Sequence, residues 1–207
     1  KRCGPTDLWT GLGGHGVAAV FDAPDRSPRP TVVLRCELDA VPVHEQPDDL
    51  DWASTTHGCA HKCGHDGHMS LLVGVARGLQ DRPLRHGRLV LLFQPAEEVG
   101  TGAALVLQDR RYIDLRPDWL FGLHNMPGYQ TGVVVLREGA FTAGSVGMKI
   151  RLEGTSAHAA YPEQSSPTAT ALAELLPALI TVPVPLERDG RLALVTVSHA
   201  QLGETVV

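Results

Sequence analysis

Residues 31–35 read TVVLR, a short apolar run of the kind that is buried on both faces of a parallel sheet. Two further apolar runs of similar length follow at 89–93 and 119–123. Between the runs, apolar residues recur at helical spacing in 69–79, and a shorter helical pattern covers 102–109. Alternating strands and helices predict an α/β domain with a mostly parallel sheet, in which the three strands are neighbours or near neighbours.

Composition excludes several classes of protein. The chain has 207 residues, 43% of them hydrophobic, and a formal net charge of -5. No apolar run approaches the roughly 20 residues that a membrane-spanning helix needs, so we expect no membrane partner. The mild acidity argues against nucleic acid, which is bound through clustered Lys and Arg. Four cysteines without framework spacing, and no secretory segment, predict a cytoplasmic protein.

A second pattern begins near residue 144. Apolar and charged residues alternate in 148–153, which predicts a half-exposed strand, and a second alternating strand is predicted at 192–199. Between them, a helix is predicted after Ser166 and Pro167, and Pro177 is expected to kink or shorten it. We therefore predict two domains, 1–143 and 144–207, of which the second is part of an α+β unit. Because the chain begins with Lys1 and ends without a cap, we expect both ends to be cut from something longer.

Metal-ligand residue types are concentrated in 57–68, which read HGCAHKCGHDGH and hold four of the ten histidines and two of the four cysteines. Thiolate and imidazole are preferred by borderline-soft divalent metals, zinc above all. Cys63 and His65 are two residues apart, so we place them in a loop, with Asp66 as the N-cap of the next helix. The positive end of that helix is expected to lower the pKa of Cys63. A histidine-rich surface loop and a structural zinc knuckle are the alternatives.

Further ligand types follow each predicted strand. Glu97 and Glu98 come after the second strand. Either one of them binds a metal while the other takes a proton from metal-bound water, or both are acids that complement the dipole of the next helix. His124 ends the third strand, and Glu37 and Asp39 follow the first. Each could be an ordinary structural residue, and the two acids could instead orient a ligating imidazole. Because the carboxyl ends of parallel strands converge on one crevice, we expect all of these side chains to meet there.

Taken together, five motifs resemble one family in order along the chain. The motifs are RCELDAVPV (35–43), HKCGHDGHMSLLVGVA (61–76), FQPAEE (93–98), FGLHNMPG (121–128) and GTSAHAAYP (154–162). They are similar to the dinuclear metallo-amidohydrolases and peptidases related to aminoacylase and carboxypeptidase G. The similarity is to the branch that contains hippurate hydrolase and auxin-conjugate hydrolase.

The resemblance implies a role for particular residues and a set of cofactors and partners. Metal ligation is implied for four residues: Cys63, His65, Glu98 and His124. Glu97 would be the general base, and Asp39 would be the supporting aspartate, whereas Glu37 stands where this branch more usually has Asp. Two divalent ions, of zinc, manganese, cobalt or nickel, would act on an N-acyl amino acid. His158 would reach the substrate from the second domain, often across a homodimer interface.

The second domain would be the family's inserted lid and dimerisation domain, a ferredoxin-like α+β unit that is incomplete here at its C-terminal end. The family's last metal ligand is a histidine in a segment that follows the lid. His199 lies in a predicted lid strand, so we do not assign it that role. We therefore expect little or no amidase activity from residues 1–207 alone.

The predicted function is hydrolysis of the amide bond of an N-acyl amino acid or a similar small amide by metal-activated water, with Glu97 accepting and returning the proton. Two alternatives belong to other classes. One is a catalytically silent metal-binding or interaction module. The other is a covalent enzyme in which Cys63 is the nucleophile and His65 or His61 activates it.

Overall fold

The computed structural model describes residues 4–25, 29–45, 50–182 and 193–203. The chain divides into two compact units, residues 1–131 and residues 132–207, and each is described separately below. Within the described residues, no helix is both long and apolar enough to cross a membrane.

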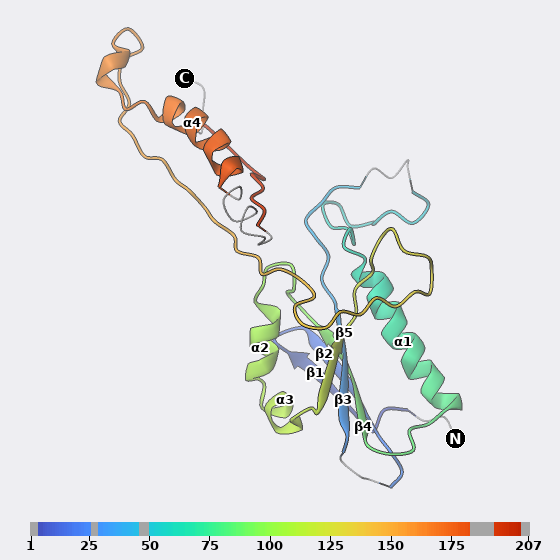
Figure 1. Ribbon diagram of the computed structural model, residues 1–207. Helices are drawn as coiled ribbons and strands as arrows, with labels where there is room; N and C mark the ends of the chain where they lie inside the picture. The colour runs from blue at the N-terminus through green and yellow to red at the C-terminus, as the bar shows by residue number, and fades with distance from the viewer. Residues whose placement is uncertain (1–3, 26–28, 46–49, 183–192, 204–207) are drawn as a thin grey trace. The chain divides into compact units, whose positions relative to one another are not determined.

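The first unit is built on a five-stranded sheet with the order β1-β2-β4-β3-β5 (Figure 1). The strands are β1 (Asp7–Leu12), β2 (Gly16–Asp22), β3 (Thr31–Glu37), β4 (Arg88–Gln94) and β5 (Trp119–Gly122). Strand β3 lies between β4 and β5 and is parallel to both, which confirms the predicted parallel neighbours. Strands β1 and β2 form an antiparallel hairpin that joins β4, so the sheet is mixed. This hairpin was not predicted from the sequence.

Helices cover both faces of the sheet, with α1 (His65–Asp81) on one face, and α2 (Gly102–Gln108) and α3 (Arg110–Leu115) on the other (Figure 1). Strand β4 serves both cores because its side chains alternate between the faces. Leu91 packs with Leu72 of α1, whereas Val90 packs with Val106 of α2. Burial on both faces is the reason that β3 and β4 are apolar without alternation.

The first turn of α1 differs from the prediction. The helix begins at His65, and its N-cap is Gly64, which has a left-handed φ of 86°. Asp66 is therefore not the N-cap but a first-turn acid, placed where a negative charge complements the helix dipole. A consequence is that His65 and His68 are on one helix, three residues apart and so on the same face.

The second unit contains a 3₁₀ turn, η2 (Pro162–Gln164), and α4 (Thr168–Thr181). The predicted helix after Pro167 is confirmed, but it continues through Pro177 to Thr181, so the expected shortening is wrong. Residues 148–153 and 193–199 are not strands, and Leu192 lies outside the described residues. A strand needs a hydrogen-bonded ladder, and neither stretch has one among the described residues. The ferredoxin-like lid is therefore not confirmed.

Candidate metal centre

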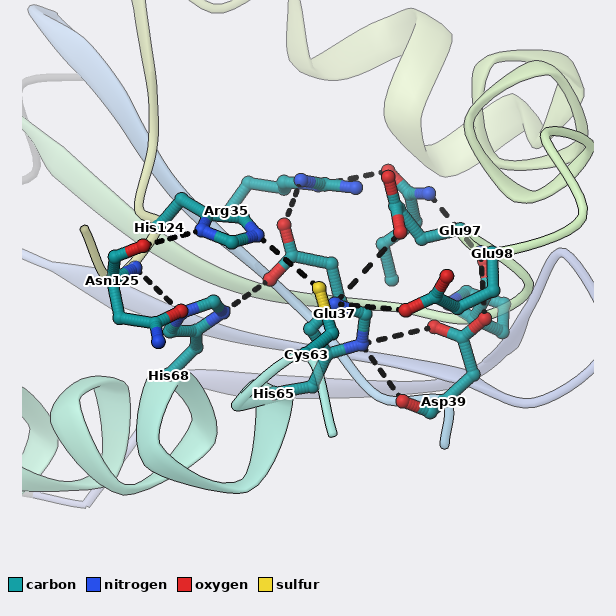
Figure 2. Close-up of polar contacts among 12 residues, drawn as sticks. Arg35, Glu37, Asp39, Cys63, His65, His68, Glu97, Glu98, His124 and Asn125 are labelled. Atoms are coloured by element: carbon teal, nitrogen blue, oxygen red, sulfur yellow. Dashed lines mark hydrogen bonds and ion pairs between the residues drawn. The ribbon is translucent and has the colours of Figure 1, made fainter. Parts of the chain in front are cut away.

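The candidate site lies where the three parallel strands end. In the sheet register, Glu37 of β3 is opposite Gln94 of β4, and Arg35 of β3 is opposite Gly122 of β5. The residues that follow these strand ends therefore come together with the first turn of α1. Figure 2 shows the resulting cluster of Asp39, Cys63, His65, Glu97, Glu98 and His124. The side chains that follow the three strand ends therefore converge at one edge of the sheet, as expected.

His65 is at the centre of this cluster and is fully buried. Its Nδ1 lies 2.7 Å from the carbonyl oxygen of Asp39, and because a carbonyl only accepts, Nδ1 carries the ring proton. The other nitrogen, Nε2, is buried and has no hydrogen-bond partner among the described residues. It lies 3.7 Å from Glu98 Oε1 and 3.8 Å from Glu97 Oε2. A buried ring nitrogen without a partner that faces two carboxylates is an arrangement that a bound cation satisfies.

His124 also directs an unprotonated ring nitrogen into the cluster. Its Nδ1 donates to the carbonyl oxygen of Asn125 at 2.8 Å, which leaves Nε2 as the acceptor, 3.4 Å from Cys63 Sγ. Two overlapping groups of potential ligand atoms result, each with all atoms within 4.8 Å of one another. One group is Cys63, His65 and His124, and the other is His65, Glu97 and Glu98. Sulfur, nitrogen and carboxylate donors together suit a borderline-soft divalent ion, so these residues fit a metal centre.

His68 is the contrasting case. It forms a third compact group with Glu37 and His65, and all three side chains are buried. Both of its ring nitrogens already have partners, because Nδ1 contacts Glu37 Oε2 at 2.8 Å and Nε2 accepts from the backbone N–H of Asn125 at 2.9 Å. We conclude that His68 supports the cluster and does not offer a free lone pair to an ion.

A tight turn after β4 presents the two glutamates. Ala96 has a positive φ of 52°, and its carbonyl oxygen accepts from the backbone N–H groups of Thr101 and Gly102. Asp39 holds the turn against β3, since its Oδ2 accepts from the backbone N–H of Glu98 at 2.9 Å. Asp39 therefore contacts both Glu98 and His65, through its side chain and its backbone carbonyl respectively.

The pKa of Cys63 is shifted in the direction opposite to the expected lowering. Burial, followed by the neighbouring carboxylate of Glu98, raises the pKa of this thiol above its ordinary value. The positive end of α1 does not prevail because Glu97 and Glu37 act in the same direction as Glu98. A raised pKa, and a contact to His124 rather than to His65 or His61, both weaken the hypothesis that Cys63 is a nucleophile activated by either of those residues.

His158 belongs to the second unit. It is exposed, its Nδ1 accepts from the backbone N–H of Ala160 at 3.1 Å, and its ring lies beside that of Tyr161. Its role toward a substrate stays a prediction.

Sequence reasoning assigned no role to three residues that complete the cluster. These are Arg35, His68 and Asn125, which the structure joins to Glu37 and His124 (Figure 2). The one available signal was the spacing of His68 three residues after His65, which places both on one helical face.

The fold and the donor set define an α/β protein with a candidate metal centre at the carboxyl ends of its parallel strands. Residues 33–198 match Peptidase family M20/M25/M40, and the chain belongs to this family. The N-acetyl-L-cysteine deacetylase of Bacillus subtilis is 35% identical over 202 residues, which are 97% of this chain and 46% of that protein. The N-acetyldiaminopimelate deacetylase of Listeria monocytogenes is 36% identical over 136 residues, which are 66% of this chain and 36% of that protein.

A solved structure is also similar. The Bacillus subtilis YXEP protein, described as a dinuclear metal binding peptidase from the M20 family, matches with a TM-score of 0.51 and 34% identity. The match covers 59% of this chain and 33% of that one. The chain thus spans less than half the length of these relatives. They place it in the M20 family, but they do not place it in the narrower hippurate and auxin-conjugate branch.

Proposed function

We propose that this chain supplies the metal centre of a hydrolase that cleaves the amide bond of N-acyl amino acids. The observation that carries the proposal is the buried Nε2 of His65, which faces Glu97 and Glu98 and has no hydrogen-bond partner in the described part of the chain. The names of the two deacetylases support an N-acyl amino acid as the substrate class. The dinuclear neighbour supports two metal ions.

Four residues would hold the metal: Cys63, His65, Glu98 and His124. Zinc, manganese, cobalt and nickel all accept this mixture of donors. When bound, the ions would polarise the substrate carbonyl and make water acidic enough to react near neutral pH. Asp39 orients His65, because its carbonyl accepts the Nδ1 proton and keeps Nε2 free.

Glu97 would be the general base. Its side chain is 40% exposed, more than the 27% of Glu98, so it reaches water more readily while still lying at the cluster. Its carboxylate would take a proton from the attacking water and return it to the leaving nitrogen. The neighbouring Glu98, whose backbone is fixed by Asp39, would serve as the ligand.

The ligand set predicts the metal content of the 207-residue chain. We expect the purified protein to bind a divalent transition metal and the Cys63→Ser, His65→Ala double variant to lose it, because two of the four donors are gone. Elemental analysis after dialysis measures this. His86→Ala is the matched control, since His86 is an exposed histidine whose Nδ1 pairs with Asp25 away from the cluster. Equal, near-zero metal in wild type and double variant would refute the assignment.

The finer features of the substrate and the assembly are also proposals. The deacetylase relatives favour an acetyl group, whereas the hippurate and auxin-conjugate branch would favour an aromatic acyl group. Turnover of N-acetyl and N-benzoyl amino acids side by side distinguishes these two.

We further propose a homodimer through residues 144–207. The described cysteines Cys36, Cys59 and Cys63 are free thiols, which supports a cytoplasmic location.

His158 would contact the substrate and not the metal. In a hydrolytically active form of the protein, we expect His158→Ala to slow turnover while metal content stays unchanged. The exposed ring, held at Nδ1 by the N–H of Ala160, is available at Nε2 to donate to a substrate oxygen. Steady-state kinetics with elemental analysis on the same sample tests this. Unchanged kinetics, or a parallel loss of metal, would exclude the proposed role.

A further inference from the structure

We propose that Arg35, Glu37 and His68 form a positioning relay that sets the ring tautomer of His124 and thereby aims its Nε2 at Cys63. The inference rests on the proposed function only in taking His124 as a ligand. It concerns residues that are not themselves metal ligands in that proposal. Figure 2 shows the relay running from Arg35 through Glu37 and His68 to Asn125 and His124.

The first step is the buried carboxylate of Glu37, which is 1% exposed. Its Oε1 pairs with the guanidinium of Arg35, and its Oε2 lies 2.8 Å from His68 Nδ1. Arg35 is held in turn, because its Nε donates to Gln94 Oε1 at 2.9 Å. Both oxygens of Glu37 thus accept from a donor, so the carboxylate requires His68 to carry its proton on Nδ1.

The second step passes from His68 to the backbone of Asn125. With the proton on Nδ1, the Nε2 of His68 is an acceptor, and the backbone N–H of Asn125 donates to it at 2.9 Å. The side-chain oxygen Oδ1 of Asn125 also lies 2.9 Å from this nitrogen. Because two acceptors do not bond, the proposed tautomer requires the amide of Asn125 to turn so that its NH₂ group faces His68 Nε2. The same amide packs against Gly64, where an added Cβ would be 3.0 Å from its terminal atoms.

The third step connects Asn125 to His124, the proposed metal ligand. The carbonyl oxygen of Asn125, held in place through the N–H of the same residue, accepts from His124 Nδ1 at 2.8 Å. This leaves His124 Nε2 unprotonated, 3.4 Å from Cys63 Sγ. The bond to Glu37 thus fixes the direction of the bond between His68 and Asn125, and that second bond fixes the position of the Asn125 backbone whose carbonyl accepts from His124. Because Glu37 and His68 are buried, water does not readily substitute for a lost partner.

Glu37→Gln is the sharpest test because it keeps the size of the side chain. A glutamine has one acceptor oxygen where Glu37 uses two, so its NH₂ group must face either Arg35 or His68 Nδ1. If the NH₂ group faces His68, it donates to Nδ1 and forces the ring proton of His68 onto Nε2. This Nε2–H then points at the backbone N–H of Asn125, so that two donors face each other. In the double variant Arg35→Met, Glu37→Gln, the competing guanidinium is gone, and the glutamine oxygen is free to accept from His68.

The relay therefore predicts that adding Arg35→Met to Glu37→Gln restores the His124 tautomer and zinc affinity. A purely structural role predicts that the second substitution lowers both further. Two readouts are measured on the 207-residue chain. Long-range ¹H–¹⁵N NMR of the metal-free protein reports the tautomer of His124, and zinc titration against a competing chelator reports affinity. We expect Glu37→Gln to lose the Nδ1–H tautomer and about 10- to 100-fold in zinc affinity, and the double variant to recover most of both.

His86→Gln is the matched control, because this exposed histidine also pairs through Nδ1 with a carboxylate, Asp25, at 2.8 Å. It should change neither readout. If Glu37→Gln keeps the wild-type tautomer and binds zinc within about twofold of wild type, the relay is wrong. If the tautomer changes but wild type binds no zinc, the relay holds and the proposed metal centre fails.

If Glu37→Gln does not fold, two variants of His68 test the relay instead. His68→Gln places its side-chain amide near the position of Nε2, whereas His68→Asn places its amide near the position of Nδ1. We expect His68→Gln to preserve the His124 tautomer better than His68→Asn, because it can still accept from the N–H of Asn125. The opposite order would overturn the relay.

Discussion

Glu97→Gln is expected to lower turnover of an N-acyl amino acid by about two to four orders of magnitude in a hydrolytically active form of the protein. The amide keeps the shape of the side chain but cannot accept a proton from water. Metal content should stay at the wild-type level, because Glu97 is proposed as the base and not as a ligand. Steady-state rates and elemental analysis of the same preparation provide the measurement.

Glu98→Gln is the matched comparison, since it makes the same chemical change one residue later in the same turn. It should lose metal affinity, because the anionic donor 3.7 Å from His65 Nε2 is replaced by a neutral amide. If Glu97→Gln retained most of the activity, the assigned base would be wrong. If both variants lost metal equally, the division of roles between the two glutamates would fail.

Gly102→Ala is expected to destabilise the protein by at least about 3 kcal/mol, at the upper end of the effects of overpacking. An added Cβ would overlap the carbonyl oxygen of Pro95, which is a backbone atom and cannot turn aside as a flexible side chain can. The turn that carries Glu97 and Glu98 would have to move, so metal binding should fall as well. Denaturant unfolding measures the stability change.

Gly74→Ala is the control for this substitution. Gly74 lies within α1, and nothing is within 4 Å of the position that its Cβ would take. The change should be neutral or stabilise the protein by up to about 1 kcal/mol, because alanine favours helix more than glycine does. Similar unfolding midpoints for the two alanine variants would contradict the steric reason given for Gly102.

The parallel strands and the helices α1 and α2 were predictable because their apolar residues follow local rules, whereas α3 was not predicted. Strand β3 begins where the TVVLR run begins, but it ends at Glu37, two residues beyond the run. A buried carboxylate at a strand end is stable only because Arg35 and His68 pair with it, and an apolar run does not reveal such partners. The β1–β2 hairpin was missed, since β1 is mostly exposed and carries no clear alternation.

Ligand residue types and their convergence were also accessible from the sequence, because parallel strands bring their carboxyl ends to one edge. Which histidines keep a free ring nitrogen was decided by the tertiary structure. His65 receives its partner from Asp39, 26 residues away, whereas His68 receives partners 31 and 57 residues away and keeps neither nitrogen free. Their spacing of three residues on one helical face makes His65 and His68 equivalent candidates. Only the folded chain supplies the hydrogen-bond partners that set each tautomer, and these partners distinguish the proposed metal ligand His65 from His68, which supports the cluster.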